Sequence, residues 1–424
     1  SLVRSKLTYG QEVYFTAPLT LLTRLQSIDS KAIKLALGVP VHTSTLKTYK
    51  EANLLPLSDQ RKLSVAKYVT KSLSVSNSIT HEVFIDSKKD YPKRAQQLSS
   101  LLSIRTYTTE LFEKCCVDIS SIQAVPTVPQ IPQWEHSKAN FDVDDSISKK
   151  ENVNVLKCNV KELLNTKFYN HLQIYTDGSV SNTSAGSGFV IPALKIKKSY
   201  CLGKGFSIFT AELYAIFMAL TYICNSASAI FNIVVCVDSK AVLYSLQTWE
   251  SKVRRDLLFE IKFLIHYIIS NGIGIYFCWV PSHCGIFWNE IADKLAKEGA
   301  LRNSSDSNLN LDAYEINSVL ESYMHRKHIP NQHVILSYPR HISSLIYKLR
   351  LNSWKTKYSQ NVTCACSHQI SCQHILFECP ILNSLYKDSG IDNKTLRLTE
   401  VSVQRTEIIN VAKVISKSIV NVLL

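Results

Sequence analysis

The feature that most constrains the fold is an alternation of short apolar runs and amphipathic segments over residues 171–300. Strand-like runs lie at 172–176, 188–192, 200–203, 233–237 and 273–280. Helices are expected at 210–224, 240–248, 255–270 and 289–298. Strands interleaved with helices predict an α/β sheet.

Four carboxylates lie at the ends of these predicted elements. Asp177 and Asp238 each follow an apolar strand, Glu212 opens an otherwise apolar helix, and Asp293 lies on the last helix. Ligand sites in open α/β sheets gather at the carboxyl ends of strands. Any one of these residues is more often a cap or turn residue. Clustered together they would repel one another unless divalent cations lay between them, and a pair of Mg²⁺ ions can hydrolyse a phosphodiester.

The motifs around these residues resemble the type 1 ribonuclease H family, in the order that the family has them. They span about 130 residues. The matching segments are Tyr175-Thr176-Asp177-Gly178-Ser179, Thr210-Ala211-Glu212-Leu213, Val237-Asp238-Ser239 and Trp279-Val280-Pro281-Ser282-His283-Cys284-Gly285 through Asn289-Glu290-Ile291-Ala292-Asp293.

The resemblance implies a mixed five-stranded sheet flanked by helices and hydrolysis of the RNA strand of RNA/DNA hybrids. It implies two Mg²⁺ ions, for which Mn²⁺ can substitute. By the same resemblance Asp177, Glu212, Asp238 and Asp293 are catalytic metal ligands, and His283 assists proton transfer or product release.

Two features depart from the family. Trp288 stands where the family usually has glycine, so the indole could reshape the histidine loop or mark a decaying gene copy. On this interpretation Trp288→Gly leaves activity unchanged or raises it. The region after Asp238 has one basic cluster, Lys252, Arg254 and Arg255, so binding of a hybrid is expected to depend on neighbouring domains.

The 424 residues are too many for one ordinary core. We expect a helical thumb-like region at 1–118, a Pro-rich and polar linker at 119–170, the ribonuclease H domain at 171–300 and a helical tail at 301–424. The linker is inferred from Pro126, Pro129 and Pro132 and the polar tract 140–154. The first long helix is inferred from an apolar spacing that ends before Gly38 and Pro40, namely Leu21, Leu25, Ile28, Ala32 and Leu35.

The net charge of +14 is concentrated near the N-terminus, where residues 1–110 carry 16 Lys and Arg against 8 Asp and Glu. Such an excess is expected either for nucleic-acid binding or for solubility. Arg24, Lys31 and Lys34 are predicted to share one basic helix face. Twelve cysteines without a secretory signal indicate a reducing compartment. No apolar run reaches the roughly 18 residues needed to span a membrane.

The N-terminal region resembles the segment after the polymerase palm in jockey-like non-LTR retrotransposon reverse transcriptases. The chain is therefore expected to be a piece of such a protein, without the palm itself. The tandem Asp144 and Asp145 lie in a polar stretch and are rejected as a polymerase site. The resembling motifs are Arg4-Ser5-Lys6-Leu7-Thr8-Tyr9-Gly10, Lys31-Ala32-Ile33-Lys34-Leu35-Ala36-Leu37-Gly38 and Glu51-Ala52-Asn53-Leu54-Leu55-Pro56-Leu57.

The tail holds a knuckle-like segment at 364–379. Cys364, Cys366, His374 and Cys379 have a spacing that can build a tetrahedral Zn²⁺ site, and free thiols are the alternative. A similar Cys/His group follows ribonuclease H in jockey-like elements.

Two functions follow from these observations. The first is metal-dependent hydrolysis of RNA/DNA hybrids, favoured by the four intact carboxylates. The alternative is a non-catalytic nucleic-acid-binding remnant of a retroelement, favoured by Trp288 and the missing palm.

Overall fold

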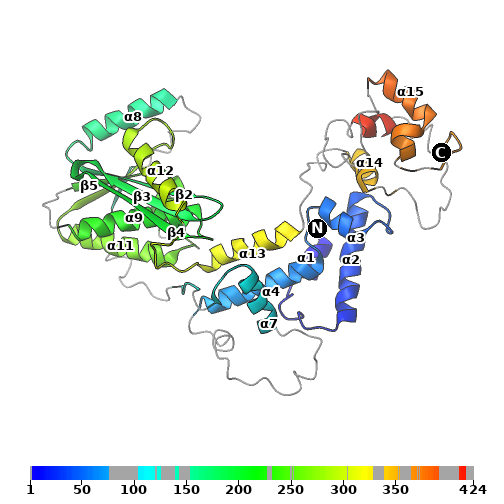
Figure 1. Cartoon of the computed structure of the whole chain (residues 1–424), viewed down its shortest axis with the longest axis horizontal. Helices are drawn as coiled ribbons and strands as arrows, with labels where there is room; N and C mark the ends of the chain where they lie inside the picture. Colours follow the sequence, from blue (N-terminus) through cyan, green and yellow to red (C-terminus); the bar gives the residue numbers. More distant parts are fainter. Residues whose placement is uncertain are drawn as a thin grey trace, which may run out of the picture. The chain divides into compact units, whose positions relative to one another are not determined.

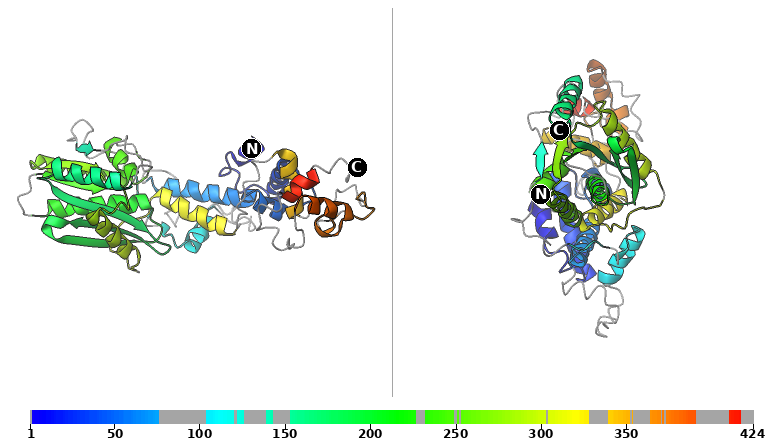
Figure 2. Two further views of the ribbon diagram at one scale, coloured as in Figure 1. Left: turned by 90° about the horizontal axis from the view of Figure 1, so that it is seen from above. Right: turned by 90° about the vertical axis from the view of Figure 1, so that its left-hand side faces the viewer.

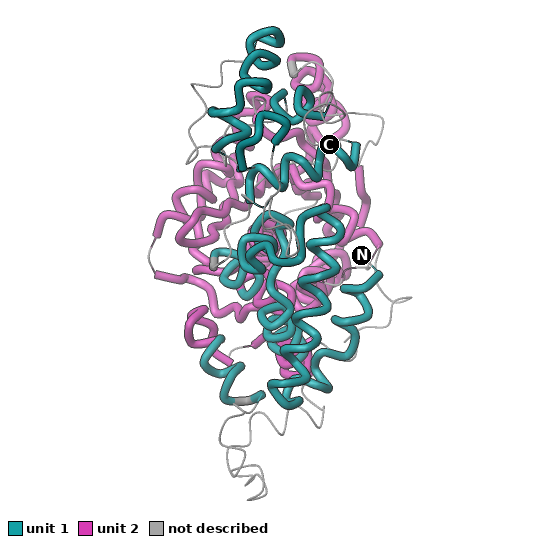
Figure 3. Tube along the Cα trace, turned by 90° about the vertical axis from the view of Figure 1, so that its right-hand side faces the viewer, with its two compact units in different colours: residues 1–68, 93–111, 320–424 teal, residues 69–92, 112–319 magenta. Residues whose placement is uncertain are grey.

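A computed structural model describes the chain in segments that fall into two compact units (Figure 1, Figure 3). Unit 1 comprises residues 1–68, 93–111 and 320–424, and unit 2 comprises 69–92 and 112–319. The described residues are 2–75, 104–119, 122–125, 139–142, 153–226, 232–248, 251, 253–302, 304–327, 339–351, 353, 364–369, 371, 373–390 and 410–416.

Unit 2 is built on a mixed six-stranded sheet with the order β1-β6-β5-β2-β3-β4. β2 pairs with β3, and β3 with β4, in antiparallel fashion, whereas β2–β5, β5–β6 and β6–β1 are parallel pairs. The alternation of strands and helices predicted from the sequence is confirmed. The strands are β1 (Asn140–Asp142), β2 (Leu172–Val180), β3 (Ala185–Ile191), β4 (Ile196–Gly203), β5 (Asn232–Val237) and β6 (Gly274–Trp279).

The sixth strand and one further helix come from the region predicted as a linker. β1 adds to the edge at β6, where the ring of Phe141 stacks on that of Phe277 with centroids 5.1 Å apart. α8 (Val153–Thr166) follows it and buries Val160 and Leu164. A three-residue strand is too short to show a period, so the sequence indicated five strands rather than six.

Helices cover both faces of the sheet (Figure 1), and Figure 2 shows the strands from two further directions. α9 (Ile208–Cys224), α10 (Lys240–Thr248) and α11 (Arg255–Ser270) share one core with alternate strand residues such as Ile174 and Val235. α8 and α12 (Phe287–Ala300) share a second core with the intervening residues such as Tyr175 and Val234. The period of two along each strand therefore divides the strand side chains between the two cores.

A close approach brings α12 onto the sheet. A Cβ at Gly188 of β3 would lie 2.6 Å from the backbone nitrogen of Ala296 and 2.7 Å from the carbonyl oxygen of Ala292. Only glycine fits at that distance, so the backbone of α12 rests directly on β3 and fixes the height of Asp293 above the sheet.

Segments from both ends of the chain share an apolar core in unit 1. Ile33 and Leu37 pack in one apolar cluster with Leu345, Leu376 and Tyr386, more than 300 residues later in the sequence. The unit contains α1 (Leu2–Thr8), α2 (Leu19–Leu37), α3 (Thr45–Glu51), α14 (Arg340–Leu351), η5 (His374–Glu378) and α15 (Pro380–Asp388), and the unit boundaries fall within α4 (Leu57–Leu73), α7 (Ile104–Lys114) and α13 (Ala313–Lys327).

Polar contacts join the same segments of unit 1. The Glu51 carboxylate pairs with the Arg350 guanidinium at 2.5 Å, and both side chains are almost fully buried. The Ser344 hydroxyl donates to the Gly38 carbonyl at 2.8 Å. The thumb-like region and the tail, which were expected as separate domains, thus contribute to one folded unit.

α2 forms as predicted and ends at Gly38, which adopts φ +69°, but the buried face differs from the predicted one. Leu21, Ile28 and Leu35 are 48–71% exposed. The buried face is one residue further along the helix, where Asp29 accepts hydrogen bonds from Arg4 and Tyr49. The helix has two adjacent apolar stripes, and tertiary contacts determine which of them is buried.

The predicted basic face of α2 is also altered. Arg24 and Lys31 are exposed, but Lys34 is 6% exposed and its ammonium donates to the Val41 carbonyl at 2.8 Å. Burial lowers the pKa of Lys34. Lys34 therefore stabilises the C-terminal end of α2 rather than facing a polyanion.

Three predicted features lie outside the described residues: the three prolines of the spacer, the Asp144–Asp145 pair and Lys252. Within the described segments, no helix combines the length and the apolar composition needed to cross a membrane.

Candidate metal sites

Two of the predicted ligands are placed by neighbouring parallel strands. Thr176 of β2 pairs in register with Val237 of β5, so the residues that follow them, Asp177 and Asp238, lie at the same edge of the sheet. Asp238 is braced from β6, where the indole N–H of Trp279 donates to the Asp238 carbonyl at 3.1 Å. Trp279 belongs to a segment that resembles the ribonuclease H family, but nothing in the local sequence indicates this hydrogen bond.

α9 brings the third ligand to this edge. Asp177, Glu212 and Asp238 each offer a carboxylate oxygen, and these three atoms lie within 4.8 Å of one another. Asp177 and Glu212 are only 4% and 5% exposed. Three carboxylates this close together, two of them buried and Asp238 partly exposed, match the oxygen-rich sites that bind Mg²⁺ or Mn²⁺.

The environment of these carboxyls opposes their ionisation. Burial, followed by the charges of Asp238 and Asp293, raises the pKa of Asp177 to about 9. Burial and then Asp238 and Asp177 raise the pKa of Glu212 well above its ordinary value. A bound divalent cation would reverse this, because it stabilises the charged form of each carboxylate.

Asp293 and His283 lie beside this group of three rather than within it. Asp293, on α12, is near enough to raise the pKa of Asp177, and one of its oxygens accepts from Lys297 at 2.6 Å. His283 lies on the exposed loop between β6 and α12 with φ +54°. The structure thus brings together three of the four predicted carboxylates directly and places the fourth next to them.

Residues 169–301 match the family model described as RNase H. These residues form an RNase H domain. Among solved structures, RNase H1 from the halophilic archaeon Halobacterium salinarum NRC-1 is similar at 21% sequence identity and a TM-score of 0.25. That match covers 30% of this chain and 96% of the archaeal chain. The comparison with curated proteins found no match.

Of the basic cluster after Asp238, Arg255 is exposed and Arg254 is buried. Arg254 of the RNase H domain is 1% exposed and pairs with Asp256 at 2.8 Å. The side chain of Arg255 donates to the Ser251 carbonyl at 2.9 Å.

Trp288, which departs from the family pattern, has a packing role. Its indole is half-buried against the second core of the domain, which α8 and α12 share, and it contacts the ring of Phe287 edge to face. The tryptophan therefore packs against the apolar core on this side of the sheet, and this gives it a structural role that the sequence alone did not reveal.

Trp288→Gly is therefore expected to lower the free energy of unfolding of the RNase H domain by about 2–4 kcal/mol, because it removes a large packed side chain and adds a helical glycine. Phe287→Gly is the matched control, since Phe287 is 62% exposed and carries the same helix penalty. Urea unfolding monitored within the domain compares the two. Equal losses in both variants would show that the indole contributes nothing by packing.

A second prediction concerns pH in the absence of metal ions. Between about pH 4 and pH 9, folded Asp177 holds a proton that the unfolded chain has released, so stability should fall as pH rises through this window. Asp177→Asn should make that slope smaller, with the raised pKa of Glu212 accounting for the part that remains, and should stabilise the metal-free domain at pH 8 by on the order of 2–4 kcal/mol. Thermal unfolding in EDTA at several pH values measures the slope. A slope in the variant as steep as in the wild type would contradict the assignment.

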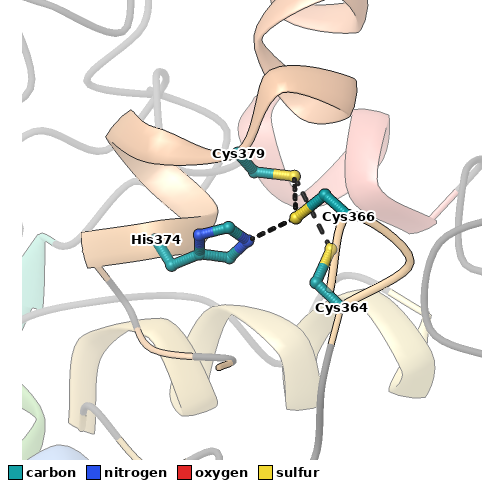
Figure 4. A group of neighbouring side chains, drawn as sticks. All are labelled: Cys364, Cys366, His374 and Cys379. Carbon is teal, nitrogen blue, oxygen red and sulfur yellow. Dashed lines mark hydrogen bonds between the residues drawn. The ribbon is translucent and has the colours of Figure 1, made fainter. Parts of the chain in front are cut away.

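The second candidate metal site is the Cys/His group of unit 1 (Figure 4). The donor atoms of Cys364, Cys366, His374 and Cys379 lie within 4.8 Å of one another. Cys379 Sγ lies 3.6 Å from Cys364 Sγ and 3.9 Å from Cys366 Sγ, and His374 Nε2 lies 3.2 Å from Cys366 Sγ. Sulfurs of a tetrahedron with 2.3 Å Zn–S bonds are about 3.8 Å apart, so the geometry fits Zn²⁺.

The surroundings of this group favour thiolate formation at one position. Burial raises the pKa of the Cys366 thiol, but hydrogen bonds from His368 and from the neighbouring thiols outweigh burial and lower it to about 6. A thiolate is the form that binds zinc. His368 itself lies outside the group of four, and Cys372 lies outside the described residues.

Proposed function

We propose that this chain hydrolyses the RNA strand of RNA/DNA hybrids with two Mg²⁺ ions, for which Mn²⁺ can substitute. The observation that carries the proposal is the convergence of Asp177, Glu212 and Asp238 at one edge of the RNase H sheet, with Asp293 beside them. The family match over residues 169–301 supports it.

In the proposed mechanism, Asp177, Glu212, Asp238 and Asp293 would hold the two ions. When bound, the ions would supply Lewis-acid chemistry for activating a water and stabilising the leaving oxygen. His283 is exposed and sits on the loop that leads to α12, where it can exchange a proton with the reacting phosphate or with water. Family resemblance implies products with 3′-hydroxyl and 5′-phosphate ends.

A cleavage assay on three duplexes of the same sequence tests the proposal. RNA/DNA hybrid, duplex DNA and duplex RNA are each incubated with the full chain in Mg²⁺, Mn²⁺ or EDTA. Only the hybrid combines a 2′-hydroxyl on the cut strand with a deoxyribose strand opposite, so only the hybrid should be cut, and only with metal. Equal cleavage of all three, or cleavage in EDTA, would refute the proposal.

We also propose that the chain derives from a jockey-like retrotransposon reverse transcriptase. The N-terminal motifs and the Cys/His group support this origin, and both belong to one folded unit. The non-catalytic remnant remains the alternative. The four carboxylates favour the enzyme, and the packing of Trp288 removes one argument for a decayed copy.

A further inference from the structure

A buried polar cluster joins the starts of α11 and α13 within unit 2. The Arg254 side chain, with no exposed surface, donates to the Asn310 carbonyl at 2.6 Å and to Asp256 at 2.8 Å, and it pairs with Glu315 at 3.5 Å. The Arg254 backbone N–H donates to Asp312 at 2.9 Å. Asp312 and Glu315 also cap α13 reciprocally through their backbone N–H groups.

Glu315 connects this cluster to the helix that carries Glu212. Its Oε1 accepts a hydrogen bond from the backbone N–H of Ser207 at 2.8 Å and another from the Thr210 hydroxyl at 2.5 Å. Ser207 is the N-cap of α9, and Glu212 lies two residues beyond Thr210. The first amides of a helix lack partners within it, and a negative charge there is favourable. Glu315, 1% exposed, therefore holds the start of α9.

The sheet fixes the same turn of α9. A Cβ at Gly178, the residue after Asp177, would lie 2.5 Å from the backbone nitrogen of Glu212, so α9 touches β2 directly. The Ser187 hydroxyl of β3 donates to the Ala211 carbonyl at 2.6 Å. The distance from Glu212 to Asp177 thus depends on the position of the first turn of α9 relative to β2 and β3.

We propose that Glu315, held in place by Arg254, is a positioning residue for Glu212. By this inference residues 302–319, which lie beyond the matched region 169–301, complete the metal-binding part of the RNase H domain. The inference rests on the proposed function in treating Glu212 as a metal ligand. Ligands must be held to about 0.5 Å, and a misplacement of about 1 Å can reduce turnover by about a hundredfold.

The first test is Glu315→Gln in the full chain, which keeps the volume and removes the charge. Hydrogen exchange should become faster in the peptide 205–213 and stay unchanged at 216–224. The Mn²⁺ or Mg²⁺ concentration for half-maximal cleavage should rise by on the order of tenfold to a hundredfold, with KM for the hybrid unchanged.

A second variant separates the contact of Glu315 with α9 from its ion pair with Arg254, and a third serves as the control. Thr210→Val removes the hydrogen bonds of the Thr210 hydroxyl with Glu315 and with the Ser207 hydroxyl and leaves Arg254 paired. The variant should shift exchange and metal dependence in the same direction as Glu315→Gln, by less. Glu51→Gln is the matched control, because it breaks a buried pair with Arg350 in unit 1 and should change neither readout.

The double variant Arg254→Met with Glu315→Leu tests a merely structural role. Replacing a buried ion pair by apolar residues restores stability in many proteins, but it cannot restore the acceptor for Ser207 and Thr210. Fast exchange at 205–213 and a raised metal requirement should therefore persist. Recovery of both readouts in this variant would overturn the proposal, as would Glu315→Gln or Thr210→Val with both unchanged.

Calorimetric Mn²⁺ binding separates this proposal from the proposed function. If the wild-type chain fails to cut hybrids but Glu315→Gln still weakens Mn²⁺ binding and speeds exchange in α9, the positioning role stands and the hydrolytic function falls. If the wild type cuts hybrids and Glu315→Gln changes none of these readouts, the function stands and the positioning role is wrong.

Discussion

Asp238→Asn is expected to reduce hybrid cleavage by at least about a hundredfold while folding and hybrid binding are kept. The amide preserves the shape of the side chain, and the Asp238 carbonyl still accepts the hydrogen bond from Trp279. The substitution replaces one of three carboxylates whose oxygens lie within 4.8 Å of one another by a neutral amide, which is a weaker ligand for Mg²⁺. Single-turnover cleavage rates and hybrid affinity, measured in parallel, check both halves of the prediction.

Asp142→Asn provides the matched control for this substitution. Asp142 lies on the edge strand β1 of the same domain and pairs with Lys167 at 2.6 Å on the surface, where an ion pair contributes little. Its removal should leave the cleavage rate unchanged. An Asp238→Asn variant that stays as active as Asp142→Asn would show that the three carboxylates are not the catalytic centre.

The RNase H sheet was predictable because its sequence shows both the apolar runs of buried strands and the carboxylates that follow two of these runs. Apolar runs such as 233–237 are bounded by polar residues, and Asp177 and Asp238 directly follow two of them. β2 continues to Val180, but its parallel pairing with β5 ends at Thr176 and Val237, so the residues that follow this pair lie at the same level of the sheet. The clustering of Asp177 and Asp238 could therefore be predicted from the sequence.

α8 was missed although its sequence holds a usable signal. Leu156, Val160 and Leu164 recur every four residues and are all buried, but the polar residues among them led to the interpretation as a linker. The packing of Trp288 was also not predictable, because the core against which it lies is formed by residues far apart in the sequence.

The contact between Glu315 and α9 could not be predicted from the sequence near either residue. The sequence indicated Arg254 only as part of a basic cluster and gave no sign of a role for Asp312 or Glu315. Only the tertiary structure shows that Arg254 and Glu315, which are 61 residues apart in the chain, form a buried pair. The buried face of α2 was predicted wrongly for a related reason. The helix has two apolar stripes, and contacts with residues far along the sequence determine which of them is buried.

Cys379→Ser is expected to release about one zinc ion per chain and to unfold the core of unit 1. Cys379 is fully buried and belongs to the same apolar cluster as Ile33, Leu37 and Tyr49. The apparent binding energy of a structural zinc, on the order of 10–16 kcal/mol, is comparable to the whole stability of a typical domain. The N-terminal helices should therefore lose protection from proteolysis together with the tail.

The RNase H domain should remain active in this variant, because its core and carboxylates belong to unit 2. Cys116→Ser is the control, since Cys116 is exposed and lies outside the Cys/His group. Metal analysis of reduced protein, limited proteolysis of residues 2–68 and hybrid cleavage give three separate readouts. Reduced wild-type protein without zinc would rule out the metal site. A Cys379→Ser variant that kept its zinc and its protected N-terminal helices would show that Cys379 neither binds the ion nor holds the two ends of the chain together.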